Sequence, residues 1–112
     1  MLPKSWRIRL EKDFDRIFSK GRSIHATTMS IKYLPSSLDN PRFGFLVSNK
    51  ISKRATQRNI IKRRLRAIVA KHAHDYKKAY DVVVLTRPPI LTRTYAQMEE
   101  EFLVVCNKLS IL

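Results

Sequence analysis

Glycine and cysteine are scarce in this chain, and their scarcity excludes several kinds of functional site. Gly21 and Gly44 are the only glycines among 112 residues, so the chain can form neither a GxxxxGK phosphate loop nor a GxGxxG dinucleotide-binding turn. The single cysteine, Cys106, excludes an internal disulfide and a cysteine-based zinc site. Because Cys106 falls on an apolar helical stripe and no general base can be paired with it, we interpret it as a small core residue.

Long apolar runs are also absent. No uninterrupted apolar segment approaches the length that crosses a membrane, and the N-terminal sequence MLPKSWRIRLEKDF lacks the apolar core of a signal peptide. We therefore expect a cytoplasmic protein that does not associate with membranes. The sequence contains no internal repeat, low-complexity tract or linker, which predicts a single domain over residues 1–112.

The few acidic and histidine residues do not predict a catalytic or metal centre. Asp13 and Asp15 would point apart on a helix, and residues 99–101 are interpreted as solvated acids in the first turn of another helix, favoured there by the helix dipole. His72 and His74 would diverge on a helix with no third ligand in view, so no zinc site is predicted. We expect a protein that binds a partner and does not carry out bond chemistry by itself.

Basic residues, in contrast, are abundant. The chain has 23 Lys and Arg against 9 Asp and Glu, a formal net charge of +14, and residues 41–74 contain no acid at all. Residues 50–66, KISKRATQRNIIKRRLR, hold eight cations within seventeen positions. Self-repulsion of this size destabilises a folded chain, and a rigid array of cations fits a regular array of anions. The commonest such partner is a nucleic acid backbone.

Hydrophobic periodicity predicts a small α+β domain. The expected order is helix, strand, strand, helix, strand, helix, which favours two layers around a small mixed sheet. Residues 36–41 read as a turn that joins the first two strands into a hairpin, and the third strand pairs with this hairpin through a helical crossover. Ser52 is a candidate N-cap, and Thr94 and Gln97 have capping-box spacing. The predicted helices span residues 10–19, 53–72 and 94–109, and the predicted strands span 23–34, 42–48 and 81–87.

Two helical faces carry the residues of interest. The second helix has a buried stripe that ends at His72, and its cations occupy an adjoining arc of roughly 140°. On the first helix, Leu10, Phe14, Ile17 and Phe18 share one face. Aromatic rings can stack on unpaired bases, but periodicity alone favours core packing for both phenylalanines. The arc of the second helix consists of Arg58, Asn59, Lys62, Arg63 and Arg66.

The basic helix resembles a known signature. The residues of its arc match the R-N-x-x-K-R-x-x-R core of the "RNR" motif in the protein subunit of bacterial ribonuclease P, and Lys50, Lys53 and Arg54 fit the usual lead-in. One residue departs from the motif, because Ile60 stands where this family usually has Arg. The neighbouring Arg64 is expected to supply part of the lost charge. Three further blocks follow the family's order: Phe14-x-x-x-Phe18-x-x-Gly21-Arg22, RFGFLVS at 42–48 and DVVVLTRP at 81–88.

The resemblance implies a specific function. Ribonuclease P removes the 5′ leader of precursor tRNA by hydrolysing one phosphodiester bond, and in bacteria its RNA subunit is the catalyst. The small basic protein is an accessory subunit that docks on this RNA, contacts the leader, and strengthens substrate and metal binding. The implied partners are therefore ribonuclease P RNA and precursor tRNA, with no DNA, and a protein that is monomeric apart from the RNA complex. Mg²⁺ would be held mainly by the RNA subunit and the substrate, and by no identifiable residue of this chain.

The resemblance also assigns roles to residues. The expected RNA-binding set is Lys50, Lys53, Arg54, Arg58, Asn59, Lys62, Arg63 and Arg66. Phe14, Phe18 and Tyr33 would line a central cleft between the first helix and the sheet that takes the leader as a single strand, which reverses the preference for core packing at both phenylalanines. Leu10 and Ile17 stay as core residues. The implied fold is an αββαβα sandwich similar to the second domain of ribosomal protein S5, with a left-handed βαβ crossover.

Two other interpretations remain open at this point. A small ribosomal protein bound to ribosomal RNA would share the charge and much of the fold, and co-purification with ribosomal subunits would identify it. An autonomous nuclease would cleave precursor tRNA with magnesium and without added RNA.

Overall fold

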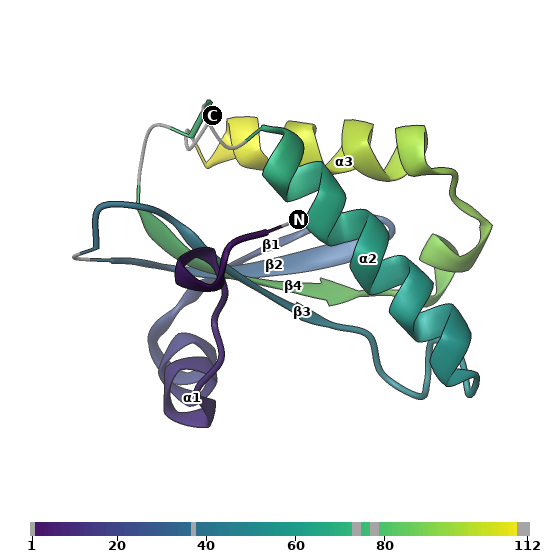
Figure 1. Ribbon diagram of the computed structural model, residues 1–112, viewed down its shortest axis with the longest axis horizontal. Helices are drawn as coiled ribbons and strands as arrows, with labels where there is room; N and C mark the ends of the chain where they lie inside the picture. Colours follow the sequence, from purple (N-terminus) through teal and green to yellow (C-terminus); the bar gives the residue numbers. More distant parts are fainter. Residues whose placement is uncertain (1, 37, 73–74, 77–78, 110–112) are drawn as a thin grey trace.

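The computed structural model describes residues 2–36, 38–72, 75–76 and 79–109, and it consists of one mixed four-stranded sheet with helices on both faces (Figure 1). The predicted α+β class with a small mixed sheet is therefore confirmed. The helix α1 adds a partial layer on the second face of the sheet, which the two-layer description did not include. The elements in chain order are η1 Lys4–Trp6, α1 Glu11–Lys20, β1 Arg22–His25, β2 Met29–Pro35, β3 Arg42–Leu46, α2 Ala55–Lys71, β4 Tyr80–Thr86, η2 Pro88–Thr92 and α3 Tyr95–Lys108.

The order of strands in the sheet is β1-β2-β4-β3, which corrects the predicted hairpin. The strands β2 and β3 are not neighbours, because β4 lies between them, antiparallel to β2 and parallel to β3. The helix α2 is thus the crossover that connects the parallel neighbours β3 and β4. Central β4 consists of YDVVVLT, an apolar run typical of a strand that is buried on both faces.

The predicted single strand over residues 23–34 is in fact the hairpin of β1 and β2. The chain turns between Ala26 and Met29, where the Ala26 amide donates to the Met29 carbonyl at 2.8 Å. The carboxylate of Glu101 on α3 binds both the backbone amide and the hydroxyl of Thr28, which is fully buried. Glu101 therefore holds this turn against α3. The interpretation of Glu101 as a solvated acid, made from the sequence, is wrong.

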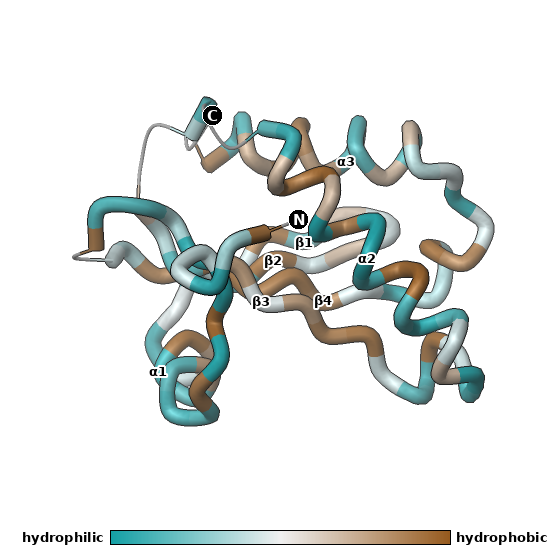
Figure 2. Tube along the Cα trace, viewed as in Figure 1, coloured by the Kyte–Doolittle hydropathy of each residue, from teal (hydrophilic) through white to brown (hydrophobic). Residues whose placement is uncertain are grey.

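Side chains of β4 alternate between two separate cores. Val82 and Val84 face α2 and α3 and belong to the larger core, whereas Val83 faces α1 and packs with Ile8 and Ile17. Hydrophobic residues accordingly gather in the strands (Figure 2). Ile17 is buried as predicted. Leu10 was predicted to be a core residue but is 54% exposed, because it is the N-cap that precedes the first turn of α1.

The N-terminal segment is part of the fold. Leu2 and Ile8 are buried, and the Ile8 amide donates to the Phe43 carbonyl at 3.0 Å, so the segment runs beside β3 as a short additional edge. The segment leads directly into α1. Its backbone bond to β3 therefore fixes the point from which α1 starts.

The helix ends confirm one prediction and correct another. The capping box at the start of α3 is present, with Thr94 and Gln97 bonding each other's backbone amides. The predicted N-cap of α2 is wrong: Arg54 occupies the N-cap position, and Ser52 instead accepts from the Arg54 amide at 3.2 Å and donates to Gln57 at 2.7 Å. At the other end, His72 is the C-cap of α2 and is only half buried.

Candidate nucleic-acid interface

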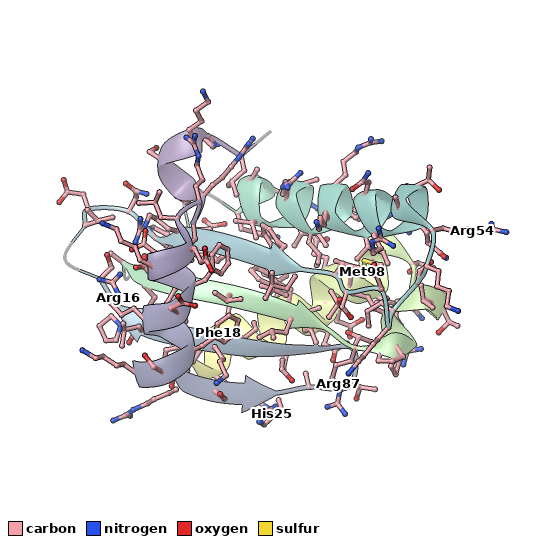
Figure 3. The ribbon with its side chains drawn as sticks, turned by 90° about the horizontal axis from the view of Figure 1, so that it is seen from below. Arg16, Phe18, His25, Arg54, Arg87 and Met98 are labelled. Carbon is pink, nitrogen blue, oxygen red and sulfur yellow. The ribbon has the colours of Figure 1, made fainter. Side chains whose placement is uncertain are left out.

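The cations predicted from the sequence lie along α2 and the loop that precedes it. The loop is anchored by Val47 and Ile51, which are 7% and 6% exposed. A bond of 3.0 Å from the Ile51 amide to the Ser48 carbonyl closes the turn between them. Figure 3 places Arg54 at the end of the molecule opposite α1. Within this loop the side chains of Lys50, Lys53 and Arg54 are all exposed.

Arg58 has a structural role in addition to its charge. Its side chain is half buried, and its Nη1 donates to the Ser52 carbonyl at 2.9 Å. The bond ties the loop to the first turn of α2 and orients the guanidinium. Substitution of Arg58 would therefore disturb the loop as well as remove a cation.

Four further polar residues of α2 form an uncompensated surface. Asn59, Arg63 and Arg66 are exposed and Lys62 is half buried. Among the described residues, none of these four forms an ion pair, whereas the ion pairs of the fold lie at the α1 end of the sheet and between α2 and α3. Ile60, which stands where the family motif usually has Arg, is 43% exposed beside this surface. We call Asn59, Lys62, Arg63 and Arg66 the α2 array.

The aromatic rings of Phe14 and Phe18 are only partly packed against the protein. Both rings are half buried against the small core of Ile17 and Val83, so each combines a packed side with an open one. Phe14 lies directly over the backbone of β3 at Gly44, where an added Cβ would stand 2.6 Å from Cε1 of the ring. The absence of a side chain at Gly44 is therefore what allows the Phe14 ring to rest on the strand.

We call the side of α1 that carries Phe14 and Phe18 its aromatic side. The α2 array and the aromatic side of α1 meet at one hollow. The hollow has a volume of about 220 Å³ and is lined by Phe14 from α1, Arg66 from α2 and the backbone of β3. Arg7 and Arg9 line it from the N-terminal segment, on either side of buried Ile8. Residues from four parts of the chain thus bring three guanidinium groups to the same place as an aromatic ring.

Tyr33 does not share this side, which corrects the prediction that it lines a cleft with Phe14 and Phe18. Along β2 the side chains alternate, so Ile31 and Tyr33 face α2 and α3, and Tyr33 packs on the larger core. Lys32 faces α1 instead: its Nζ lies 5.6 Å from the Phe18 ring centroid and 3.4 Å from the Phe18 carbonyl oxygen. Lys32 is therefore the β2 residue that accompanies the aromatic side.

Sequence reasoning missed Arg7, Arg9 and Lys32. A signal was available for the first two, because the alternation in RIR around a buried isoleucine indicates an extended segment with both arginines on one side. For Lys32 the signal was the alternation of side chains along β2. That signal can be used only when it is known which face of the sheet α1 covers.

Two acidic side chains at this end of the molecule, Asp13 and Asp81, are engaged in ion pairs. Asp81 is 1% exposed and accepts from Nε and Nη2 of Arg42 at 2.9 and 2.7 Å and from Nη2 of Arg16 at 2.9 Å. These bonds raise the pKa of the Arg42 guanidinium, chiefly through the hydrogen bond to Asp81. Asp13 lies 3.5 Å from Arg42 and 3.8 Å from Arg16. The cluster joins α1 to β3 and β4.

The structure also shows the surroundings of His72 and Cys106. Nε2 of His72 lies 3.0 Å from Glu99, which also pairs with Lys71, so Glu99 is not a solvated first-turn acid. The hydrogen bond from Lys71 is the main cause that lowers the pKa of Glu99. His74 lies outside the described residues. Cys106 is fully buried, as predicted, and burial raises its pKa to about 12.

Within the described part of the chain, no three His, Cys, Asp or Glu side chains gather so that they could hold a metal ion. None of its helices combines the length and the apolar character that crossing a membrane requires.

Comparisons with known proteins match this chain to one family. The family model described as Ribonuclease P matches residues 2–110. A curated relative, the ribonuclease P protein component of Syntrophomonas wolfei, is 36% identical over 108 residues, which cover 96% of this chain and 90% of the relative.

Solved structures are similar over nearly the full chain. A Staphylococcus aureus RNase P protein mutant, described as having defective mRNA degradation activity, has a TM-score of 0.90 at 28% identity and covers 97% of this chain and 92% of its own. The RNase P protein from Thermotoga maritima has a TM-score of 0.84 at 27% identity, covering 91% and 96% respectively.

Proposed function

Since this chain belongs to the ribonuclease P protein family, whose members are protein components in tRNA processing, we propose that it binds the catalytic RNA of ribonuclease P and the 5′ leader of precursor tRNA. In this proposal the RNA subunit hydrolyses the phosphodiester bond, and the protein assists without contributing a catalytic residue. The α2 array and the loop cations contact RNA phosphates, and the aromatic side of α1 receives the leader as a single strand.

The observation that carries the proposal is the hollow shared by Phe14 and Arg66. A single-stranded nucleic acid alternates phosphates with flat bases, and proteins bind it by combining cations that follow the backbone with aromatic rings that stack on bases. Here Arg7, Arg9 and Arg66 surround an aromatic ring that is open on one side. The surface is thus complementary to a strand that passes from α1 toward α2. Both kinds of contact are independent of base identity, so one protein can serve many leaders.

Charge explains how the protein assists. The leader and the catalytic RNA are both polyanions, and bringing them together has an electrostatic cost. A chain of net charge +14 placed between them lowers that cost. The same effect would let the RNA bind its magnesium ions at lower concentration.

Magnesium itself does not fit the described residues of this chain. Magnesium prefers carboxylate oxygens and water in octahedral geometry, and the most buried carboxylate, Asp81, is occupied by Arg16 and Arg42. We therefore assign the ion to the RNA subunit and the substrate, and derive no step of the protein's action from it.

Reconstitution tests the proposal. The protein is added to a bacterial ribonuclease P RNA at low magnesium, and removal of a labelled 5′ leader is followed over time. We expect faster leader removal than with the RNA alone, and a difference that narrows as magnesium is raised. A protein that leaves the rate at low magnesium unchanged would contradict the proposal.

The protein alone is the necessary control. We expect no leader removal by the pure protein with magnesium, and cleavage in that sample would favour an autonomous nuclease. Because one S. aureus relative is described as a mutant with defective mRNA degradation activity, the control should also include an mRNA substrate. Co-purification with ribosomal subunits in place of ribonuclease P RNA would favour the ribosomal alternative.

A substitution at Gly44 tests the leader contact without removing a charge. In Gly44→Ala the new Cβ would lie 2.6 and 2.9 Å from two Phe14 ring atoms, so the ring must move off the strand. Stacking of one base on an aromatic ring is worth roughly 1–3 kcal/mol, so we expect precursor tRNA to bind at least about fivefold more weakly. Affinity for mature tRNA, which has no leader, should stay unchanged.

A double-mutant cycle separates this effect from general damage. Phe14→Leu removes the same stacking contact, so its loss and that of Gly44→Ala should not add when the two are combined. Additive losses would show that Gly44→Ala does not act through the Phe14 ring. An equal loss of affinity for mature tRNA in Phe14→Leu would show that Phe14 does not contact the leader.

A further inference from the structure

A second hollow lies where α1 ends and β4 begins. It has a volume of about 370 Å³ and is lined by Tyr33 of β2 and Tyr80 of β4, together with Leu34, Pro35 and Leu109. The two rings meet edge to face, with centroids 5.5 Å apart and an interplanar angle of 77°. Both side chains are half buried, so they are held in place by the larger core and still reach the surface.

The rim of this hollow is cationic. Lys20 at the end of α1, Arg22 at the start of β1 and Lys108 at the end of α3 line it, and no carboxylate does. All three side chains are exposed, and within the described residues none of them forms an ion pair. Three charges without a partner around two aromatic rings are the chemistry that recognises a nucleotide, with phosphate on the cations and a base on a ring.

The two tyrosines of the hollow lie on the face of the sheet opposite the aromatic rings of the proposed leader surface. Phe14 and Phe18 lie on the α1 face, whereas Tyr33 and Tyr80 pack with the core under α3. The hollow also includes residues from the α1 side, since Lys20 ends α1 and Leu34 packs with the small core. The strand β4 begins at Tyr80, at the end of the sheet remote from the start of α2 (Figure 1). The tyrosine rings are therefore a stacking surface distinct from that of Phe14 and Phe18.

We infer that the hollow of Tyr33 and Tyr80 is a second RNA-binding site, which takes an unpaired nucleotide of an RNA strand. Tyr33 belongs to it and not to the leader cleft. The volume is within the range of small-ligand sites and suits one nucleotide. The site gives the protein a second pair of aromatic rings for RNA, on the face of the sheet opposite Phe14 and Phe18.

The first test uses the isolated protein. A ¹⁵N-labelled sample is titrated with hexauridylate, and amide shifts are followed at Tyr33 and Tyr80 and along α2. We expect shifts in both places for the wild type. In Arg22→Gln/Lys108→Gln, two exposed changes, the shifts at Tyr33 and Tyr80 should require at least tenfold more ligand, while those along α2 should titrate as before. Lys4→Gln/Lys12→Gln is the control with an equal change of charge.

Stacking is tested separately from charge. Tyr80→Phe keeps the ring and should bind hexauridylate as the wild type does, whereas Tyr80→Leu should lose the response at Tyr33. Titration with inorganic phosphate distinguishes an anion site from a nucleotide site. If phosphate alone reproduces the shifts with the same affinity, or if Tyr33 and Tyr80 do not respond to hexauridylate, the inference is wrong.

The source of the nucleotide is identified in the complex. Arg22→Gln/Lys108→Gln is compared with the control variant for affinity to ribonuclease P RNA and, in the assembled complex, to precursors with long and short leaders. A several-fold loss toward the RNA subunit assigns the site to that RNA, and a loss only with long leaders assigns it to the leader. If neither affinity changes, the site does not act in the complex. Binding of hexauridylate here is independent of the reconstitution result, so the two proposals can fail separately.

Discussion

Asp81→Asn is expected to lower the melting temperature by roughly 12–24 °C, the largest effect of any single substitution considered. Asp81 is 1% exposed and accepts three hydrogen bonds, two from Arg42 and one from Arg16. Removing one partner of a buried ion pair leaves the others uncompensated and typically costs about 3–5 kcal/mol. Because Arg16 is 45% exposed, we take the lower end of this range, a loss of about 3 kcal/mol in the free energy of unfolding. In domains near this size each kcal/mol lowers the melting temperature by about 4–8 °C.

Asp13→Asn is the matched control for this prediction. Asp13 belongs to the same cluster but lies farther from its partners, 3.5 Å from Arg42 and 3.8 Å from Arg16, and its side chain is 14% exposed. Its removal should cost about 1 kcal/mol or less. Thermal unfolding followed by circular dichroism measures both variants. Equal shifts for Asp13→Asn and Asp81→Asn would contradict the view that Asp81 is the centre of the cluster.

The Asp81 cluster also matters for the candidate site. It joins α1, through Arg16, to β3 and β4, and α1 carries Phe14 and Phe18 on the side turned to the sheet (Figure 3). A variant that still folds but has lost the cluster should therefore hold both rings less firmly. We expect such a variant to lose affinity for precursor tRNA in excess of mature tRNA.

Features set by neighbouring residues were predictable from the sequence. The helices α1, α2 and α3 were placed within about two residues by their hydrophobic spacing, and the capping box at Thr94 is an entirely local pattern. The cations of α2 were assigned to one arc for the same reason. What failed was the pairing of strands, because β4 inserts between β2 and β3 from more than thirty positions away in sequence, and no local pattern specifies this.

The error at Tyr33 follows from the period of a strand. Side chains alternate between faces, so a shift of one residue moves a side chain to the opposite face of the sheet. Lys32 and Tyr33 are adjacent, and choosing between them requires knowing which face of β2 α1 covers. That fact is set by tertiary packing of Ile17 on Val83. The aromatic residue was the more attractive candidate for stacking, yet it is the lysine that lies over Phe18.

The largest functional effect is expected from removing two cations of the α2 array together. Arg63 and Arg66 are exposed, belong to one helical face, and form no ion pair among the described residues, so Arg63→Gln/Arg66→Gln should leave the melting temperature nearly unchanged. A hydrogen bond to a charged group contributes about 1.5 kcal/mol or more. Two such contacts amount to about 3 kcal/mol, so affinity for ribonuclease P RNA or precursor tRNA should fall by more than about a hundredfold.

Salt dependence shows whether this loss is a loss of phosphate contacts. Each phosphate contact contributes about 0.7–0.9 to the slope of log affinity against log salt concentration. The slope should therefore become shallower by about 1.5 in Arg63→Gln/Arg66→Gln, and the variant should approach the wild type at high salt. Lys4→Gln/Lys12→Gln changes the net charge equally, away from the array, and should keep most of the affinity. A positioned array makes Arg63 and Arg66 more important for binding than Lys4 and Lys12. If both double variants lose the same affinity, total charge determines binding and the placement of cations on α2 does not.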